Sequence, residues 1–184
     1  MVICDLRPDA EAAIVQAAQL LVEGFREHWP NAWPTLEAAL DEVRECLSAE
    51  RICRIAMLEE TVVGWIGGIP QYDGHVWELH PLVVRADARG CGIGRALVED
   101  LEAQVAARGG LTIYLGTDDE DDMTTLSGVD LYDDLWGRIA HIQNLKGHPY
   151  SFYARLGYSI VGVVPDANGP GKPDICMAKR VQSR

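Results

Sequence analysis

The chain has 184 residues, of which 48% are hydrophobic, and a formal net charge of −12 at pH 7. That length and apolar content predict one globular domain spanning residues 1–184. The negative charge argues against nucleic acid as a partner, because phosphate backbones are bound by basic surfaces, and favours a cationic ligand instead.

The N-terminal residues lack the basic and long apolar regions of a signal peptide, and no apolar run approaches the roughly 20 residues that span a bilayer. We therefore expect a cytoplasmic protein with no membrane partner. Five cysteines are scattered without a C-x-x-C pair, which predicts neither a disulfide framework nor a metal site. Most of these cysteines should pack as small apolar side chains.

The first half of the chain predicts two helices and four strands. After Pro8-Asp9, apolar residues recur at helical spacing, and this helix should end near Trp29-Pro30. Thr35 is a suitable N-cap for the second helix. The strands are predicted at about residues 2–6, 51–58, 61–69 and 76–84, with the second and third forming a hairpin across Glu59-Glu60.

The second half predicts a helix, a central strand, an insertion, a short helix and two further strands. The helix covers residues 93–107 and stops at Arg108-Gly109-Gly110, and the apolar strand covers 111–116. Residues 117–147 form an acidic insertion with a hint of helix at Leu131, Trp136, Ile139 and Ile142. A short helix at 148–158 and strands at 159–164 and 174–179 complete an α/β fold with helices on both faces of a mixed sheet.

The segment from Trp77 to Arg95 combines a strand with a glycine-rich loop. Glu78 and His80 are two residues apart and therefore share one face of the strand. The loop Arg89-Gly90-Cys91-Gly92-Ile93-Gly94 opens a helix, and backbone N–H groups at such a helix start suit phosphate oxygens. The alternative is a simple helix-capping turn.

Carboxylates are concentrated after the central strand. Residues 118–122 are all acidic, and Asp130, Asp133 and Asp134 follow closely. This run is either a solvated acidic loop or part of a cation-binding site.

Two motifs resemble those of one superfamily. The loop at residues 89–94 is similar to the Arg/Gln-x-x-Gly-x-Gly/Ala signature of the GNAT superfamily of acetyl-CoA-dependent N-acetyltransferases, and residues 152–158 are similar to its later Phe-Tyr-x-x-Leu-Gly-Phe/Tyr element. Four further segments, at residues 69–72, 77–84, 114–119 and 161–169, resemble chromosomally encoded aminoglycoside 6'-N-acetyltransferases. The resemblance covers nearly everything from residue 50 onward.

The resemblance implies a GNAT fold, a mostly antiparallel sheet whose splayed central strands hold acetyl-CoA. The backbone of Leu82, Val83 and Val84 would pair with the pantetheine arm, and the Leu82 N–H would polarise the thioester carbonyl. The other implied cofactor-binding residues are the pyrophosphate loop with its flanking charges and one pantetheine contact: Arg89, Gly90, Cys91, Gly92, Ile93, Gly94, Arg95 and Asn144.

The implied reaction is direct attack by the aminoglycoside 6'-amine on acetyl-CoA in a ternary complex, which confers antibiotic resistance. Deprotonating an ammonium of pKa about 10.4 costs roughly 4 to 5 kcal/mol at pH 7, so a base is needed. Glu78 is the candidate base, directly or through water, and His80 is either a relay or structural. Tyr153 is the candidate acid for the CoA thiolate, at a cost of about 2 kcal/mol, or else a core residue.

A polycationic drug needs carboxylates in its pocket. By resemblance, Glu78 and Asp118 would line that pocket, with Trp29, Tyr72 and Asp119 as neighbours and Asp166 and Asp174 as further candidates. Trp29 and Trp33 have an alternative as packing residues at a helix end. The resemblance also implies a homodimer.

Two other functions stay open at this point. One is a GNAT acetyltransferase for another amine, such as a polyamine or a protein N-terminus, which would share the CoA machinery. The other is a catalytically silent domain that binds CoA or sequesters the drug.

Overall fold

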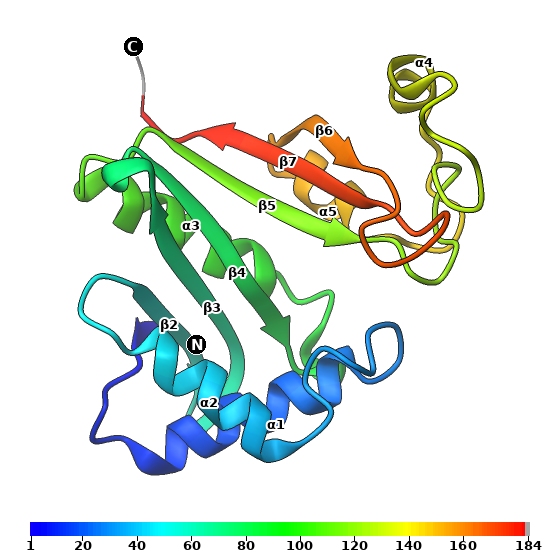
Figure 1. Ribbon diagram of the computed structural model, residues 1–184. Helices are drawn as coiled ribbons and strands as arrows, with labels where there is room; N and C mark the ends of the chain where they lie inside the picture. The colour runs from blue at the N-terminus through cyan, green and yellow to red at the C-terminus, as the bar shows by residue number, and fades with distance from the viewer. Residues whose placement is uncertain (183–184) are drawn as a thin grey trace. The chain divides into compact units, whose positions relative to one another are not determined.

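The computed structural model describes residues 1–182 and consists of two compact units (Figure 1). The first unit contains Met1–Ile113 together with the C-terminal residues from Val181, and the second contains Tyr114–Arg180. That the whole chain is one domain stays a prediction. Among the described residues, no helix is long and apolar enough to cross a bilayer.

The first unit contains four antiparallel strands in sequence order. They are β1 (Val2–Asp5), β2 (Ile52–Leu58), β3 (Thr61–Gln71) and β4 (Val76–Val84). The predicted hairpin is confirmed, since β2 and β3 pair from Leu58 and Thr61 onward and Glu59 adopts a positive φ of 55° in the turn. A short 3-10 turn, Tyr72–Gly74, joins β3 to β4.

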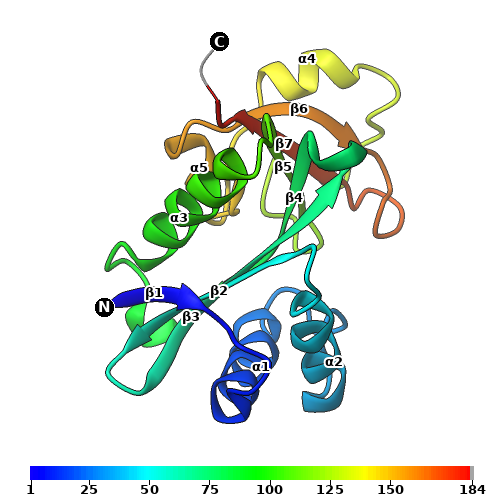
Figure 2. The same cartoon turned by 90° about the vertical axis from the view of Figure 1, so that its left-hand side faces the viewer.

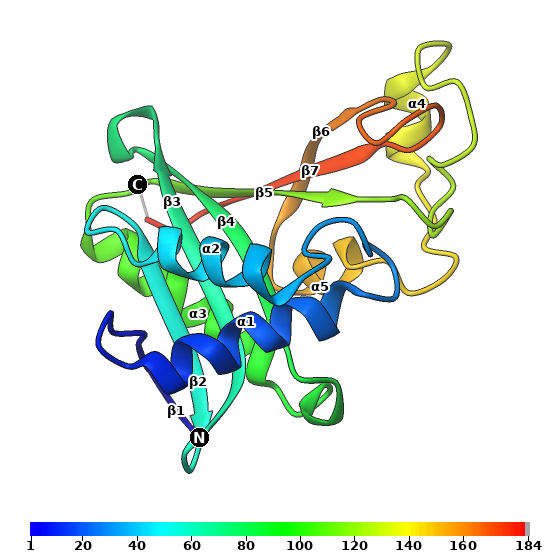
Figure 3. The ribbon, with the colours of Figure 1, turned by 60° about the horizontal axis from the view of Figure 1, so that its bottom comes forward.

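Two helices cover one face of these strands and a third covers the other (Figure 2). Helices α1 (Glu11–Phe25) and α2 (Leu36–Cys46) lie side by side, as Figure 3 also shows, and α3 (Ile93–Ala107) packs on the opposite face. Thr35 caps α2 as predicted, because its hydroxyl accepts the Ala38 N–H at 3.2 Å. The four strands therefore form a layer between the two helices on one face and α3 on the other.

The first helix ends earlier than predicted. Regular α-helix stops at Phe25 rather than near Trp29-Pro30. A single further turn persists, in which the Trp29 N–H donates to the Phe25 carbonyl at 2.8 Å, but the chain then folds back so that aromatic side chains pack on Phe25. Tertiary packing, rather than the proline alone, sets this boundary.

The core explains the strand order of the first unit. Ile14, Leu21 and Val43 from the two helices are buried against Trp65 of β3, which is fully enclosed. On the other face, β3 approaches α3 so closely that a Cβ at Gly64 would lie 2.9 Å from the Leu97 side chain. Burial of this size supplies most of the folding free energy, at about 25 cal/mol per Å² of apolar surface.

A half-buried ion network also links α3 to the strands. Arg54 on β2 donates to Asp100 on α3 through Nε at 2.7 Å and through a terminal nitrogen at 3.0 Å, and to Asp5 on β1 at 2.6 Å. The hydrogen bonds to Asp100 raise the pKa of the Arg54 guanidinium above its usual range. The bidentate geometry fixes the orientation of α3, which begins with the glycine-rich loop.

The second unit contains three strands in the order β5-β7-β6 and two short helices. Strand β5 (Thr112–Asp118) begins at the end of the first unit, and β6 (Ser159–Val164) pairs antiparallel with β7 (Asp174–Arg180). The helices are α4 (Leu135–Ala140) and α5 (Tyr150–Arg155). The predicted mixed α/β fold with a mostly antiparallel sheet and flanking helices is confirmed.

Two boundaries in the second unit differ from the prediction. Of the four apolar residues that hinted at a helix in the insertion, only Trp136 and Ile139 lie in α4, because Asp134 caps that helix by accepting the Gly137 N–H. Helix α5 starts at Tyr150 rather than at residue 148, since Pro149 occupies its N-cap. The insertion is tied back on itself by a β-bridge between Thr124 and Asn144.

Candidate functional site

Strand β4 contains a bulge at the centre of the predicted site. Leu79 is opposite Gly68 and Leu82 is opposite Ile66, so β4 contains one residue more than β3 across this stretch. Gly67 faces the bulge, where a Cβ would lie only 2.3 Å from the His80 carbonyl oxygen. Bulges redirect side chains, and only glycine allows this close approach.

The side chains along β4 alternate in burial around the bulge. Trp77, Leu79 and Val83 are buried, whereas Glu78 and His80 are half-buried and share the other face, together with Leu82 and Val84. The predicted base and its histidine neighbour are therefore accessible while their strand is anchored in the core. Of the three residues whose backbone is predicted to pair with pantetheine, Leu82 and Val84 have half-buried side chains and Val83 has a buried one.

The Glu78 carboxylate has one neighbour on the adjacent strand. The Gln71 side chain donates its Nε2–H to Glu78 at 3.4 Å, a long hydrogen bond that leaves most of the carboxylate's accepting capacity unused. A carboxylate in this state can accept further protons or cations. This geometry is compatible with a base but does not assign that role.

An aromatic cluster from the α1–α2 connection lies beside His80. The Trp33 ring is 5.8 Å from the His80 ring and packs edge-on against Phe25 at 4.7 Å. Trp29 packs against the same Phe25 ring at 5.7 Å. Both tryptophans thus pack at the end of the helix, which is the alternative that the sequence left open for them. Trp33, which we did not select as a site residue, contacts His80.

The glycine-rich loop has the backbone geometry of an anion cradle. Gly90 and Gly92 have φ values of 79° and 85°, and a Cβ at either position would meet nothing within 4 Å. The first intrahelical bond of α3 runs from the Ala96 N–H to the Gly92 carbonyl at 3.0 Å, so the N–H groups of Ile93, Gly94 and Arg95 precede the helical ladder. The exposed loop and its N–H groups fit a pyrophosphate.

The two arginines beside this loop have other contacts. Arg89 donates to the backbone carbonyls of Val84 at 3.2 Å and Gly24 at 3.5 Å, which ties the end of β4 to α1. Arg95 lies 3.4 Å from Glu99 one turn along α3. Cys91 is exposed in the loop itself. The arginines still contribute positive charge near the loop, although the contact with Glu99 partly offsets that of Arg95.

Tyr153 is buried on α5 in the second unit, between the rings of Phe152 at 5.1 Å and Tyr158 at 5.7 Å. Burial raises the pKa of the Tyr153 phenol above its usual value. The phenol therefore keeps its proton at physiological pH, as a proton donor must. The same shift makes it a weaker acid, so protonation of a thiolate costs more than the sequence-based figure of about 2 kcal/mol.

Asp118 and Asp119 have different environments although they are adjacent. The Asp118 carboxylate at the end of β5 accepts the Asn168 amide at 2.5 Å. Asp119 is fully buried, and its carboxylate accepts the Met123 N–H at 2.7 Å and the Thr124 N–H at 2.9 Å. Asp119 therefore shapes the loop through these contacts, and its role as a neighbour of the substrate stays a prediction.

The Asn144 side chain also forms hydrogen bonds within the protein. Its Nδ2 donates to the His148 carbonyl at 2.8 Å and to the Ser151 hydroxyl at 2.7 Å, and its Oδ1 accepts the His148 N–H at 2.7 Å. Both amide protons are used in these contacts. The side chain thus holds the start of α5, and its contact with pantetheine stays a prediction.

The acidic loop contains a carboxylate that the sequence prediction did not select. Desolvation, followed by the charges of Asp118 and Asp121, raises the pKa of Glu120. Lys172, from the loop between β6 and β7, opposes this shift but forms its ion pair with Asp122 at 2.8 Å. The negative charge around Glu120 is therefore incompletely neutralised, which favours a cationic ligand. The acidic run was visible in the sequence, but which of its members are clustered was not.

The remaining predicted substrate residues are less constrained. Tyr72 is 78% exposed and has a positive φ of 49° in the turn before β4. Asp166 accepts the Gly171 N–H at 2.6 Å and so closes the loop between β6 and β7. The Asp174 carboxylate on β7 lies against Gly116 of β5, since a Cβ built at Gly116 would be 2.6 Å from that carboxylate. Tyr72 and Asp174 stay candidates.

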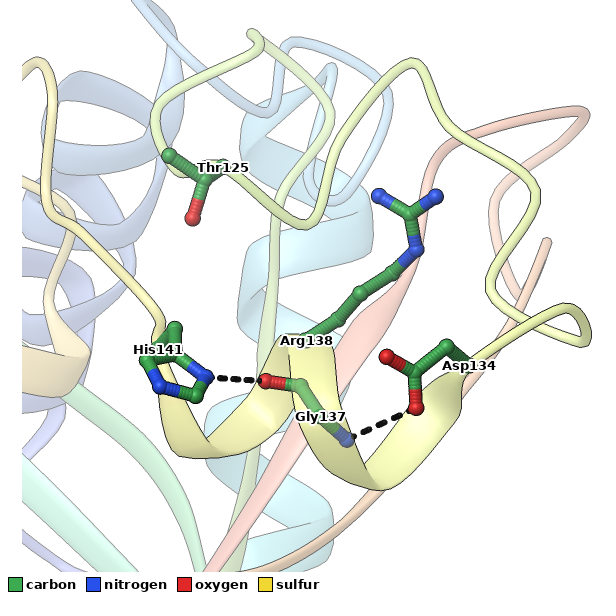
Figure 4. A pocket seen from close by; sticks show the side chains of 5 residues that line it. All are labelled: Thr125, Asp134, Gly137, Arg138 and His141. Carbon is green, nitrogen blue, oxygen red and sulfur yellow. Dashed lines mark hydrogen bonds between the residues drawn. The ribbon is translucent and has the colours of Figure 1, made fainter.

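An open pocket of about 310 Å³ lies around α4 (Figure 4). It is lined by Thr125, Asp134, Gly137, Arg138 and His141. Asp134 accepts the Gly137 N–H, and the His141 ring is hydrogen-bonded to the Gly137 carbonyl at 2.8 Å. Neither Glu78 nor Tyr153 lines this pocket, and we assign it no chemistry.

The chain matches one protein family over most of its length. Residues 15–132 match the Acetyltransferase (GNAT) family, a range that contains β4 and the glycine-rich loop. No curated protein matches the chain.

Solved structures give closer matches. The chain is 47% identical to an aminoglycoside 6'-N-acetyltransferase in complex with coenzyme A, with a TM-score of 0.92 and coverage of 100% of this chain and 99% of that one. A similar enzyme from Enterococcus faecium is also 47% identical, with a TM-score of 0.90 and the same coverage. An aminoglycoside 6'-acetyltransferase type Ii is 40% identical, with a TM-score of 0.77 and the same coverage.

Proposed function

Because this chain belongs to the Acetyltransferase (GNAT) family, we propose that it is an aminoglycoside 6'-N-acetyltransferase that uses acetyl-CoA. The observation that carries this proposal is the 47% identity to such an enzyme over the full length of both chains. The reaction moves the acetyl group to the 6'-amine in a ternary complex and releases CoA, which removes a positive charge from the antibiotic and so confers resistance. The identity supports this function over acetylation of another amine and over a silent binding domain.

The glycine-rich loop is our proposed site for the pyrophosphate of acetyl-CoA. The N–H groups of Ile93, Gly94 and Arg95 would receive the phosphate oxygens, because Gly90 and Gly92 leave space beside them. When bound, acetyl-CoA supplies the thioester whose acetyl group is transferred. The backbone of Leu82, Val83 and Val84 would hold the pantetheine arm, with the Leu82 N–H directed at the carbonyl oxygen.

Glu78 is our proposed base. The incoming amine must lose a proton before or during attack, and its deprotonation at pH 7 costs roughly 4 to 5 kcal/mol. The half-buried Glu78 carboxylate accepts a long hydrogen bond from Gln71 and keeps capacity to accept more, so it can take this proton directly or through water. Before transfer, the same carboxylate would pair with the ammonium. His80, in ring contact with Trp33, would orient this region or relay the proton.

Tyr153 is our proposed acid. Its buried phenol stays protonated and can donate to the sulfur of the departing CoA. The raised pKa means that the proton moves only as negative charge develops on sulfur, so alignment matters more than acidity. The rings of Phe152 and Tyr158 restrict the orientation of Tyr153.

The acidic loop is our proposed binding region for the polycationic drug. Asp118, Glu120 and Asp121 bring negative charges together, and the pKa of Glu120 is raised first by burial and then by repulsion from the charges of these two neighbours. Several ammonium groups on an aminoglycoside would relieve that repulsion. With Glu78, Tyr72 and Trp29, these carboxylates form the proposed substrate set.

We also propose a homodimer in the cytoplasm. The edge strand β6 exposes Val161 at 55% and Val164 at 48%, and Trp136 on α4 is 69% exposed, so these apolar surfaces are suited to cover by a second copy. The five cysteines are all free thiols, as expected in a reducing compartment. Sedimentation of the protein at micromolar concentration tests the dimer, and a monomeric mass would reject it.

Kinetics of two variants test the proposed mechanism. Glu78→Gln and Tyr153→Phe should each lower kcat for kanamycin by about 10- to 1,000-fold, the range of a lost general base or acid, with near-normal melting temperatures. Asp87→Asn, at an exposed carboxylate in the turn after β4, is the matched control and should retain activity. Normal turnover in both site variants would reject the acid–base assignment. Spermidine turned over as well as kanamycin would favour a polyamine acetyltransferase.

A further inference from the structure

A buried histidine in the second unit has a role that the mechanism above does not use. His148 is only 1% exposed. Its Nε2 lies 3.1 Å from the backbone carbonyl oxygen of Asp118, and its Nδ1 lies 3.2 Å from the backbone nitrogen of Tyr150. The ring therefore connects the end of β5 to the start of α5.

The two contacts fix the protonation of the ring. A carbonyl oxygen only accepts hydrogen bonds and a backbone N–H only donates, so Nε2 must carry the proton and Nδ1 must be bare. Only the neutral Nε2–H tautomer satisfies both partners. Nδ1 accepts a hydrogen bond from the backbone N–H of Tyr150. This N–H lies in the first turn of α5 and therefore has no acceptor inside the helix.

The backbone on both sides of His148 is also held. Asn144 contacts both the N–H and the carbonyl of His148, as well as the Ser151 hydroxyl inside α5. His148 is thus restrained along its main chain as well as at both ring nitrogens. The start of α5 has little freedom to shift, and Tyr153 lies one turn further along this helix.

The other end of the connection is the acidic loop. Asp118 ends β5, and the next residue, Asp119, anchors the loop through the N–H groups of Met123 and Thr124. Thr124 in turn forms the β-bridge with Asn144. The loop and the segment before α5 therefore form one hydrogen-bonded network, in which His148 contributes the contact to the Asp118 carbonyl.

We propose that His148 is a positioning residue that holds the drug-binding carboxylates and the Tyr153 helix in register through its two ring nitrogens. The inference rests on the proposed function, since it acts through Asp118 and Tyr153. It gives the two ring contacts separable effects. The Nε2–H contact fixes the position of the drug-binding loop and therefore affects KM for the aminoglycoside. The Nδ1 contact fixes the position of α5, which carries Tyr153, and therefore affects kcat.

Two substitutions separate these effects. In His148→Asn the amide oxygen can occupy the position of Nδ1 and accept the Tyr150 N–H, but no donor reaches Asp118. In His148→Gln the amide nitrogen can occupy the position of Nε2 and donate to Asp118, but the acceptor for Tyr150 is lost. Loss of one hydrogen bond of this kind corresponds to about a 3- to 10-fold effect.

We expect His148→Asn to raise KM for kanamycin about 3- to 10-fold with kcat within about twofold of wild type. We expect His148→Gln to lower kcat about 3- to 10-fold with KM within about twofold. KM for acetyl-CoA should be unchanged in both. His141→Asn and His141→Gln, at an exposed histidine on the same loop, are matched controls and should behave as wild type.

A parallel change of KM, kcat and stability in both variants would contradict the proposal. If both His148 variants raise KM and lower kcat together, in proportion to their loss of melting temperature, His148 is only a structural residue and the proposal fails. Should the variants not fold, nitrogen NMR of the wild-type ring still decides, because the Nδ1–H tautomer or a charged ring at pH 7 would overturn the proposal and the Nε2–H tautomer would support it.

Failure of the proposed function gives a different pattern. Asp118→Asn and Tyr153→Phe are measured in the same assay, and they should raise KM and lower kcat respectively. If wild type releases no thiol with kanamycin, or if neither of these variants changes the kinetics, the proposed function or its site residues are wrong and the role of His148 falls with them. If they behave as expected and only the His148 split is missing, the positioning proposal alone is rejected.

Discussion

The contact between β3 and the β4 bulge provides a sharp test of how the site is held. Replacing Gly67 with alanine would place a Cβ 2.3 Å from the His80 carbonyl oxygen, 3.2 Å from the His80 carbonyl carbon and 3.1 Å from the Cys46 sulfur. The obstructing oxygen belongs to the main chain, so no side-chain rotation relieves the overlap. The strands must separate by roughly 1 Å, close to where Glu78 and His80 are presented.

The cost of this substitution follows from overpacking. Extra carbons in a well-packed core cost about 1 to 3 kcal/mol, and a main-chain obstacle on one side favours the upper end of that range. For a chain of this size, a loss of about 3 kcal/mol lowers the melting temperature by about 6 to 12 °C. Displacement of a base by roughly 1 Å can lower turnover about 100-fold, so kcat/KM should fall more than stability alone explains.

Thermal melting and steady-state thiol release, measured side by side, test the Gly67→Ala prediction. Gly162→Ala on β6 is the matched control, because a Cβ there would meet nothing within 4 Å and φ is not positive. The control should melt at or slightly above the wild-type temperature, since alanine is favoured over glycine in a strand by about 0.5 to 1 kcal/mol. Wild-type stability and activity in Gly67→Ala would refute the claim that this close approach sets the site.

Three further outcomes are expected. Glu120→Gln should stabilise the free protein by a few tenths of a kcal/mol, because the raised pKa means that the folded state disfavours the charged carboxylate, yet raise KM for the drug; a lower melting temperature would contradict this. Asp119→Ala leaves two buried N–H groups without an acceptor and should cost about 2 to 4 kcal/mol in urea unfolding, against near-zero if the carboxylate only faced substrate. Burial raises the pKa of Tyr153, so kcat should show no phenol-dependent fall as pH rises to 10, and a descending limb due to this phenol would contradict the raised pKa.

The parts of the fold that depend on local patterns were predictable from the sequence. The hairpin of β2 and β3, the β4 strand and the glycine-rich start of α3 follow from strand periodicity and backbone requirements of neighbouring residues. The role of Thr35 as an N-cap also depends only on residues one turn away. These predictions are confirmed because tertiary contacts reinforce the local preference.

The parts that depend on distant residues were not predictable. The insertion takes its course from the bridge between Thr124 and Asn144 and from the pairing of Lys172 with Asp122. Partners that are 20 or more residues apart leave no periodic signal. For the same reason, a run of five acidic residues gave no indication of which one is buried and which ones are clustered.

The predicted site likewise contains parts that depend on neighbouring residues and parts that depend on distant ones. The strand that contains the proposed base and the glycine-rich loop proposed for the pyrophosphate were both selected from contiguous residues, and their geometry is compatible with these proposed roles. Contacts such as that of Trp33 with His80, and the commitment of Asn144 to α5, join segments whose proximity only the fold creates. The identities of the acid, the base and the drug-binding carboxylates stay predictions until variants are measured.

The most direct test of the proposed function is CoA thiol release with paired aminoglycosides that differ only at the 6' position, one with an amine and one with a hydroxyl. We predict saturable thiol release, and an acetylated product, with the 6'-amino compound and background release with its 6'-hydroxyl partner. Equal release with both compounds would show that another amine is acetylated. Release with neither compound, despite binding of acetyl-CoA, would contradict the assignment as an aminoglycoside 6'-N-acetyltransferase.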